Sequence, residues 1–164
     1  MIVVQAGEGE PLGVGASTGL IGRAEWAAGN VCVLDQIVQP KHMSPVHFHE
    51  AESQAAYVVS GRLGFWVNGR ESEARTGAYV VRPAGKPHAL WNPTDEPAHM
   101  LEITSPATRF QEYLHKLSVL RNDDEADPAT VKRLAAEYGL TFLDEITDEL
   151  SRRHGLDPSG SFWK

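Results

Sequence analysis

Short apolar runs, each about the length of a β-strand, fill most of the first hundred positions of this sequence. Five of them are VCVLDQIV (31–38), AAYVVS (55–60), LGFWVN (63–68), AYVVR (78–82) and HALWN (88–92). Glycine, proline and asparagine bound these runs, as is typical of strands joined by turns. Asn68-Gly69 lies between two of the runs and is a strong signal for a two-residue hairpin. Many short strands at regular spacing predict an antiparallel sandwich or barrel over residues 1–104.

The hydrophobic period changes after residue 104. Ser105-Pro106 is a typical helix start, and apolar residues at helical spacing follow it. Three helices are predicted, over 106–121, from Asp127-Pro128 to Gly139, and from about Leu143 to His154. Gly155 is predicted to end the third helix, and Phe142 is counted among its inward-facing residues. We therefore expect residues 105–164 to form a C-terminal helical extension that packs on the barrel or on a dimer partner.

The composition limits which classes of binding partner and which cellular compartment we expect for this protein. The 164 residues include 15 Lys+Arg against 22 Asp+Glu, a net charge of −7 at pH 7. Nucleic acid and anionic membranes are poor matches, because neutralising phosphates requires clustered Lys and Arg. Cys32 is the only cysteine, which excludes an intrachain disulfide and a zinc–cysteine cluster. The N-terminus lacks the pattern of a secretion signal, and no apolar run approaches the roughly 20 residues of a membrane span. We expect a soluble, cytoplasmic protein.

Residues 131–155 superficially resemble a helix-turn-helix. The segment that would be the recognition helix carries four acids, Asp144, Glu145, Asp148 and Glu149. Acidic side chains facing phosphates repel DNA. This segment therefore gives no reason to expect nucleic-acid binding.

The stretch HMSPVHFHEAESQ (42–54) carries the clearest chemical signal. His47 and His49 alternate, and in a strand such residues face the same side, about 6.6 Å apart. Two imidazoles on one face can share a metal ion, with bonds near ~2.1 Å as for zinc. Two ordinary histidines on an edge strand would give the same pattern, so further ligands are needed to decide.

Two longer patterns contain these histidines and a third one. They are His47-x-His49-x4-Gln54-x6-Gly61 and Gly77-x5-Pro83-x-Gly85-x2-His88-x3-Asn92. Together they resemble the two motifs of the cupin superfamily, G-x5-H-x-H-x3–4-E-x6-G and G-x5-P-x-G-x2-H-x3-N. The second pattern matches at every defined position. The first has Lys41 in place of the opening glycine and Gln54 in place of the glutamate.

The resemblance implies an antiparallel jelly-roll barrel of six to eight strands with a metal ion in its mouth. It assigns the metal ligands to His47, His49, Gln54 and His88, and gives Pro83 and the motif glycines to turns. Asn92 is predicted to be a turn residue. The cofactor would be one divalent transition metal ion (Fe, Ni, Cu, Mn or Zn), since imidazole suits several of these metals.

The amide at position 54 changes the chemistry expected of such a site. Gln54 offers a carbonyl oxygen but cannot titrate near neutral pH, so it cannot act as a general base. Loss of the anionic ligand should weaken metal binding and leave more positive charge, which favours an anionic substrate or one that ionises. Candidate bases are Glu52, if its loop folds back toward the ion, and Glu102, if it faces inward. Both are otherwise expected to be solvated acids.

The resemblance implies a metal-dependent enzyme acting on a small oxygenated organic molecule, and leaves the reaction open. The helical tail is similar to that of small bacterial cupins grouped with quercetin dioxygenases, which favours a dioxygenase. The amide fits better the non-redox isomerases and cyclases of sugar acids or polyketides, in which the metal polarises a carbonyl. A non-catalytic small-molecule-binding cupin is the third alternative. A homodimer is expected, because sheet edges and apolar faces need cover.

Several other side chains have an open or secondary role. Three strand aromatics can line the cavity but pack more often in a core, and they are Tyr57, Trp66 and Trp91. Three histidines outside the two patterns are predicted to lie on the surface, and they are His42, His115 and His154.

Overall fold

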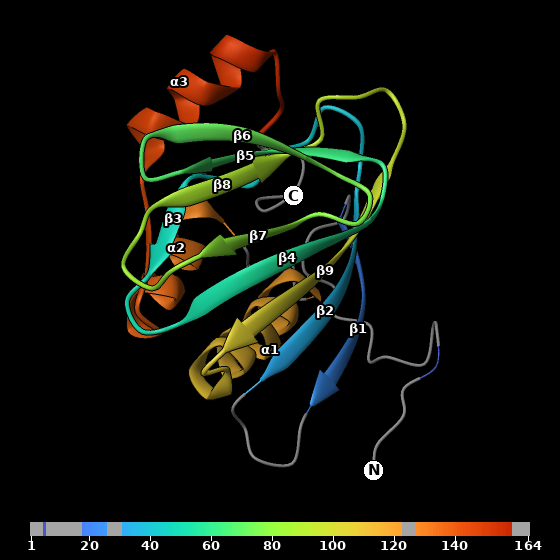
Figure 1. Ribbon diagram of the computed structural model, residues 1–164. Helices are drawn as coiled ribbons and strands as arrows, with labels where there is room; N and C mark the ends of the chain where they lie inside the picture. Colours follow the sequence, from blue (N-terminus) through green and yellow to red (C-terminus); the bar gives the residue numbers. More distant parts are fainter. Residues whose placement is uncertain (1–4, 6–17, 26–30, 123–126, 159–164) are drawn as a thin grey trace.

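Two antiparallel sheets followed by helices make up the fold (Figure 1). The structure, a computed structural model, describes residues 5, 18–25, 31–122 and 127–158. The first sheet has the order β1 (Thr18–Glu25), β2 (Cys32–Val38), β9 (Ala98–Ser105), β4 (Ser53–Ser60), β7 (Tyr79–Arg82). The second sheet has the order β10 (Leu140–Phe142), β3 (His47–His49), β8 (His88–Trp91), β5 (Arg62–Val67), β6 (Arg70–Arg75). The expected mainly β architecture of jelly-roll type is confirmed.

The predicted hairpin joins β5 to β6. Asn68 and Gly69 have φ angles of 48° and 86°, and Val67 pairs with Arg70 on either side of them. Positive φ at both central residues is the signature of the two-residue turn whose twist matches that of the strands. The Asn-Gly prediction is therefore confirmed in detail.

Three helices follow the barrel strands. They are α1 (Thr108–Asn122), α2 (Pro128–Glu137) and α3 (Asp144–His154). Asp127 caps α2 by accepting hydrogen bonds from the next turn, and Gly155 ends α3 with a φ of 62°. The predicted start at Ser105-Pro106 is wrong, because Ser105 is the last residue of β9 and α1 begins at Thr108. None of the helices in the described ranges is long and apolar enough to cross a membrane.

A short strand between α2 and α3 was not predicted. Residues 140–142 form β10, which pairs antiparallel with β3 so that Leu140 faces His49 and Phe142 faces His47. The prediction had placed Phe142 on the third helix. Three residues are too few to show a strand period, and their partner lies about ninety positions earlier. Because a strand separates α2 from α3, residues 131–155 are not a helix-turn-helix.

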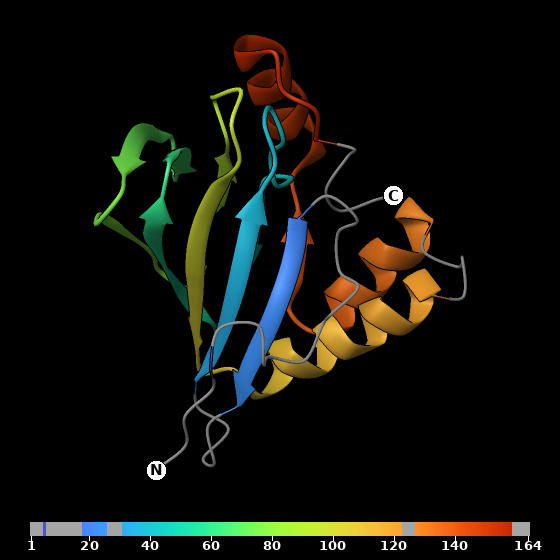
Figure 2. The same cartoon turned by 90° about the vertical axis from the view of Figure 1, so that its right-hand side faces the viewer.

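The core of the described part of the chain consists of three clusters, one between the two sheets and two beneath the helices. One cluster fills the space between the two sheets and contains Val38, Ala56, Phe65 and Met100. A second joins α1 and α2 to β2 through Leu34, and Figure 2 shows these helices on one side of β1 and β2. In a third cluster, Leu150 of α3 packs with Ala89 and Trp91 of β8. The extension therefore packs on the barrel strands of its own chain.

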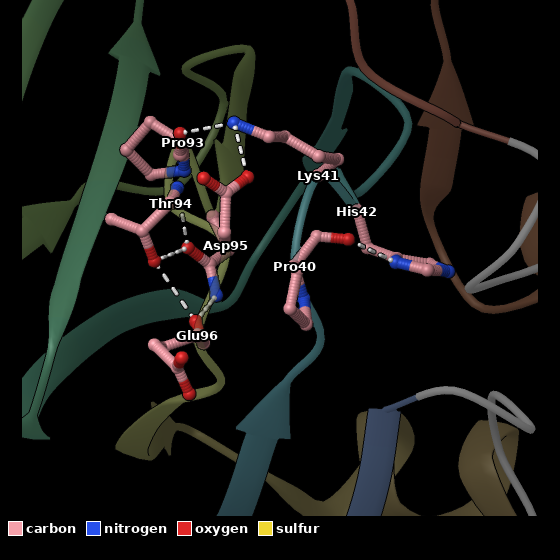
Figure 3. Close-up of polar contacts among 8 residues, drawn as sticks. Pro40, Lys41, His42, Pro93, Thr94, Asp95 and Glu96 are labelled. Atoms are coloured by element: carbon pink, nitrogen blue, oxygen red, sulfur yellow. Dashed lines mark hydrogen bonds and ion pairs between the residues drawn. The ribbon is translucent and has the colours of Figure 1, made fainter.

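Lys41 occupies the place of the first motif's opening glycine and keeps a backbone shape that glycine adopts easily. Its φ is 61°, in the left-handed region. Its amide N–H donates to the Asn92 carbonyl at 3.0 Å. Its Nζ donates to the Pro93 carbonyl at 2.9 Å and lies 3.1 Å from Asp95 (Figure 3). Lys41 thus links the two motif loops.

Asn92 organises the second of these loops. Its Nδ2 donates to the carbonyls of Val38 at 2.9 Å and Glu96 at 2.7 Å. Its Oδ1 accepts from the amide and hydroxyl of Thr94, at 2.9 and 2.7 Å. All four side-chain bonds hold the loop, so the predicted turn role of Asn92 is confirmed.

Candidate metal centre

Three buried histidines from the two motif strands meet in the second sheet. Strands β3 and β8 pair so that His47 faces His88, and His49 lies two residues along on the same side as His47. One ring nitrogen from each histidine lies within 4.8 Å of the others. Ring centroids are 4.6 Å apart for His47–His88 and 5.2 Å for His47–His49. The geometry is that of three imidazoles able to share one ion.

Burial keeps these imidazoles neutral. Desolvation is the main cause that lowers the pKa of His47 from 6.5 to about 4. It also lowers the pKa values of His49 and His88, and the nearby charge of His47 is the second cause in both. Neutral imidazole is the form that binds a metal, so no proton has to leave these rings at neutral pH.

Backbone carbonyls set the orientation of two of the rings. The Nδ1 atoms of His47 and His88 lie 2.8 Å from the Pro45 carbonyl and 2.9 Å from the Lys86 carbonyl. Because a carbonyl only accepts, each Nδ1 carries the proton and each Nε2 presents its lone pair. Hydrogen bonds of this kind orient the histidine ligands of metals.

His49 has no such support. Both of its ring nitrogens are buried without a hydrogen-bond partner among the described residues. The nearest acid oxygen, Oε2 of Glu52, is 3.8 Å from its Nδ1, which is too far for a hydrogen bond. Buried polar atoms are rarely left in this state, and a bound ion would satisfy one of these nitrogens.

Gln54 of β4 brings its amide oxygen to the same place. Its Oε1 lies 3.0 Å from Nε2 of His88, while its Nε2 lies 3.4 Å from the Thr104 hydroxyl. With the His88 proton on Nδ1, two lone pairs face each other across the 3.0 Å contact. A cation held by both atoms would accept both lone pairs and so remove this mismatch. The residues present therefore fit a metal ion.

A cavity of about 70 Å³ adjoins this cluster, at the junction of both sheets and the extension. His47 and Gln54 lie in its wall. The apolar part of the cavity wall is formed by Phe110, Tyr113 and Leu114 of α1 and by Leu140 and Phe142 of β10. The C-terminal extension is therefore part of the site. Sequence patterns alone did not indicate this, because they do not say which barrel face a helix covers.

A buried ion pair lies in the same cavity wall. Nη2 of Arg82, on β7, contacts both carboxylate oxygens of Glu102, on β9, and both residues are at most 3 % exposed. Arg82 is directly opposite Gln54 in the sheet register. Burial raises the pKa of Glu102, and the Arg82 charge opposes that rise. Sequence reasoning did not single out Arg82, although strand alternation places it on the same face as Val80.

The two candidate bases have different positions. Glu102 faces the cavity, as one alternative had anticipated. Glu52 is buried beside His49 and does not line the cavity, and burial is the main cause that raises its pKa. Its carboxylate lies next to a histidine of the cluster and is not in the group of potential metal-binding atoms. Glu52 is thus placed to influence His49 and not a molecule in the cavity.

The structure also corrects several predictions about which residues line the cavity. Trp91 and Trp66 pack in or against the cluster under α3, and Tyr57 faces outward on the first sheet, so none of the three lines the cavity. His42 lines it, so its prediction as an ordinary surface residue is wrong. The position of His42 follows from the loop held by Lys41, which no local pattern specifies.

The fold and the three-histidine cluster define a class: small two-sheet barrels with a potential metal site between their motif strands. Residues 34–104 match the family described as Cupin domain (Cupin_2). The matched residues contain both histidine motifs. No curated protein matches it.

Several solved structures are similar to part of the chain. TT1209 from Thermus thermophilus is 25% identical with a TM-score of 0.47, over 51% of this chain and 83% of its own. A sugar phosphate isomerase from Silicibacter pomeroyi DSS-3 is 25% identical with a TM-score of 0.44, over 46% and 50% of the two chains. A salicylate 1,2-dioxygenase from Pseudaminobacter salicylatoxidans is 22% identical with a TM-score of 0.47, over 51% and 24%. This chain therefore spans half or less of the isomerase and dioxygenase chains.

Proposed function

We propose that this chain is a metal-dependent enzyme that transfers a proton on a small, anionic, oxygen-bearing substrate, as an isomerase or ring-opening enzyme does. One observation carries the proposal. The carboxylate of Glu102, paired with Arg82, is buried in the same cavity wall as His47 and Gln54. A potential metal site and a potential proton acceptor thus face the same cavity.

In this proposal His47, His49, His88 and the Gln54 oxygen hold one divalent ion. When bound, such an ion supplies Lewis-acid chemistry and polarises a carbonyl of the substrate. Neutral rings and a neutral amide leave the charge of the ion uncompensated. Arg82 and Glu102 neutralise each other, so the loaded cavity is positively charged overall and favours an anion such as a carboxylate.

Glu102 is the residue proposed to accept the proton. A general base works best when its pKa lies near the working pH, and burial moves the pKa of Glu102 in that direction. Arg82 holds the carboxylate in place through Nη2 and can stabilise negative charge that develops nearby. The apolar side formed by Phe110, Tyr113 and Phe142 limits access of water.

A dioxygenase of quercetinase type is the second candidate. The observation that favours it is the aromatic side of the cavity, where Phe110, Tyr113 and Phe142 suit a planar aromatic substrate. Glu102 would then take the hydroxyl proton that Gln54 cannot accept. The two candidates thus share the site and differ in whether oxygen is consumed.

The first test is metal content. Protein purified without added metal should carry close to one equivalent of a divalent metal by elemental analysis, and His88→Ala should lose most of it. Gln54→Glu should retain metal more strongly during dialysis against a chelator, because a carboxylate adds a negative charge to the ligand set. A Gln54→Glu protein that loses metal at the wild-type rate would remove the amide from the proposed ligands.

The second test separates the reactions. Loaded protein is incubated in D₂O under nitrogen with small hydroxy and keto sugar acids, and solvent deuterium is followed by NMR. Incorporation that Glu102→Gln abolishes without loss of metal supports proton transfer with Glu102 as the base. Oxygen uptake on a flavonol in air, with no incorporation under nitrogen, would favour the dioxygenase instead.

A further inference from the structure

One ring nitrogen of His49 still needs a partner after an ion has bound. A neutral imidazole carries a proton on one nitrogen and a lone pair on the other. The ion takes the lone pair, so the N–H requires a hydrogen-bond acceptor if it is buried. Both ring nitrogens of His49 are buried, and neither has a hydrogen-bond partner among the described residues. The ion alone therefore cannot satisfy this ring.

Glu52 has the complementary deficit. Its Oε2 atom is also buried without a hydrogen-bond partner among the described residues. This oxygen lies 3.8 Å from Nδ1 of His49, and the side chains of His49 and Glu52 are 0 % and 4 % exposed. Leaving a buried donor and a buried acceptor unpaired is unfavourable for each of them. Closing the gap by about 1 Å would form a charge-assisted hydrogen bond of ~2.8 Å and satisfy both.

The burial of Glu52 is specific within its loop. The loop joins β3 to β4, and in it Glu50, Ala51 and Ser53 are exposed while Glu52 is buried. Glutamate is almost never fully buried unless it is paired. The loop therefore turns one of its two acids inward, beside a histidine of the cluster, and leaves the other in solvent.

Two backbone contacts hold the loop on either side of Glu52. The Glu50 amide donates to the Gly139 carbonyl at 2.9 Å, in the turn before β10. The Ser53 hydroxyl accepts from the Ala84 amide at 3.1 Å, in the turn of the second motif. The backbone around Glu52 is thus fixed, and its carboxyl group can reach His49 by rotation about its terminal torsion, which has a broad energy minimum.

The other two histidines already have the arrangement that Glu52 would complete. The Nδ1 atoms of His47 and His88 face backbone carbonyls, so each ring presents Nε2 to an ion. The rings of His49 and His88 are parallel, with an interplanar angle of 3° and centroids 5.8 Å apart. If Nδ1 of His49 donates to Glu52, all three rings bind the ion through Nε2.

Glu52 also carries the negative charge that the ligands lack. Gln54 is in the place of the motif glutamate, so the four proposed ligands are neutral. A carboxylate that accepts a hydrogen bond from a metal-bound histidine orients the ring and makes it a stronger ligand. Glu52 does not line the cavity, so it balances part of the charge of the ion from the side away from the substrate.

We propose that Glu52 is a positioning residue for the metal centre. In the loaded protein its carboxylate accepts a hydrogen bond from Nδ1 of His49, directs that ring to bind the ion through Nε2, and provides the charge that Gln54 does not. Glu52 thus acts on the ion through His49 and not on the substrate as a base. This inference rests on the metal site of the proposed function and not on its reaction.

Zinc binding to the metal-stripped full chain is the first test, measured by competition with a chromophoric chelator. Glu52→Gln keeps the size of the side chain and removes its charge, and it should weaken zinc binding roughly 10- to 100-fold. The matched control is Glu50→Gln, which removes an exposed acid from the same loop. It should change the affinity by less than about 3-fold, because solvent screens an exposed charge.

The second test observes the His49 ring itself. Nitrogen-15 NMR of zinc-loaded wild-type protein should show His49 with a proton on Nδ1 and zinc on Nε2. Glu52→Gln should shift the Nδ1 proton signal of His49 and leave those of His47 and His88 in place. A purely structural role would instead lower the melting temperature of the metal-free protein and leave zinc affinity unchanged.

Three results would overturn the inference. Zinc bound through Nδ1 of His49 in the wild-type protein would do so without any variant. Equal zinc affinities for Glu52→Gln and Glu50→Gln, with tight binding by wild type, would overturn this inference and leave the proposed function intact. A wild-type chain that binds neither zinc nor nickel would overturn both together. Circular dichroism of each variant shows whether the fold is retained.

Discussion

Acidification should destabilise the metal-free protein because of the buried histidines. His47 takes up a proton at pH 6.5 when unfolded, but only near pH 4 when folded. Between these values the unfolded state binds more protons, so the free energy of unfolding falls as pH falls. The contribution of His47 is complete above pH 6.5 and lost below pH 4. At ~1.4 kcal/mol per pH unit, His47 alone accounts for about 3 kcal/mol over this window.

Urea unfolding with a chelator present, followed by tryptophan fluorescence, measures this loss. Between pH 6 and 4.5, wild-type stability should fall more steeply than that of His47→Gln, by up to ~1.4 kcal/mol per pH unit. The lowered pKa values of His49 and His88 add slope in the same direction in both proteins. His115→Gln, outside the cluster, should keep the wild-type slope. Parallel curves for wild type and His47→Gln would refute the reasoning.

Two further substitutions test the barrel framework. Gly64→Ala should lower the free energy of unfolding by about 2 kcal/mol or more in urea titrations, because a Cβ there would lie 2.2 Å from Cε2 of Trp91. An unchanged midpoint would show that Trp91 can move aside. Lys41→Gly should stay within about 1 kcal/mol of wild type, because it relieves the left-handed backbone while losing an exposed ion pair with Asp95. Lys41→Val loses the ion pair with Asp95 and keeps a side chain on a left-handed backbone. Its melting temperature should therefore be lower than that of Lys41→Gly.

The sequence by itself determined the features that depend on neighbouring residues. Strand alternation placed His47 and His49 on one face, and Asn68-Gly69 specified a turn that only residues tolerating positive φ can form easily. Gly155 marked the end of α3 for the same reason. These features follow from backbone geometry over a few residues. His88 entered the prediction by a different route, through the resemblance to the two cupin motifs.

The tertiary structure alone decided what surrounds those histidines. Arg82 and Glu102 meet across strands that are twenty positions apart, and β10 adds the wall residue Phe142 from the far end of the chain. The pKa of His47 falls because distant segments remove water from around it, which no local pattern records. Burial and charge pairing depend on the whole fold, because the groups that supply them are close in space and remote in sequence.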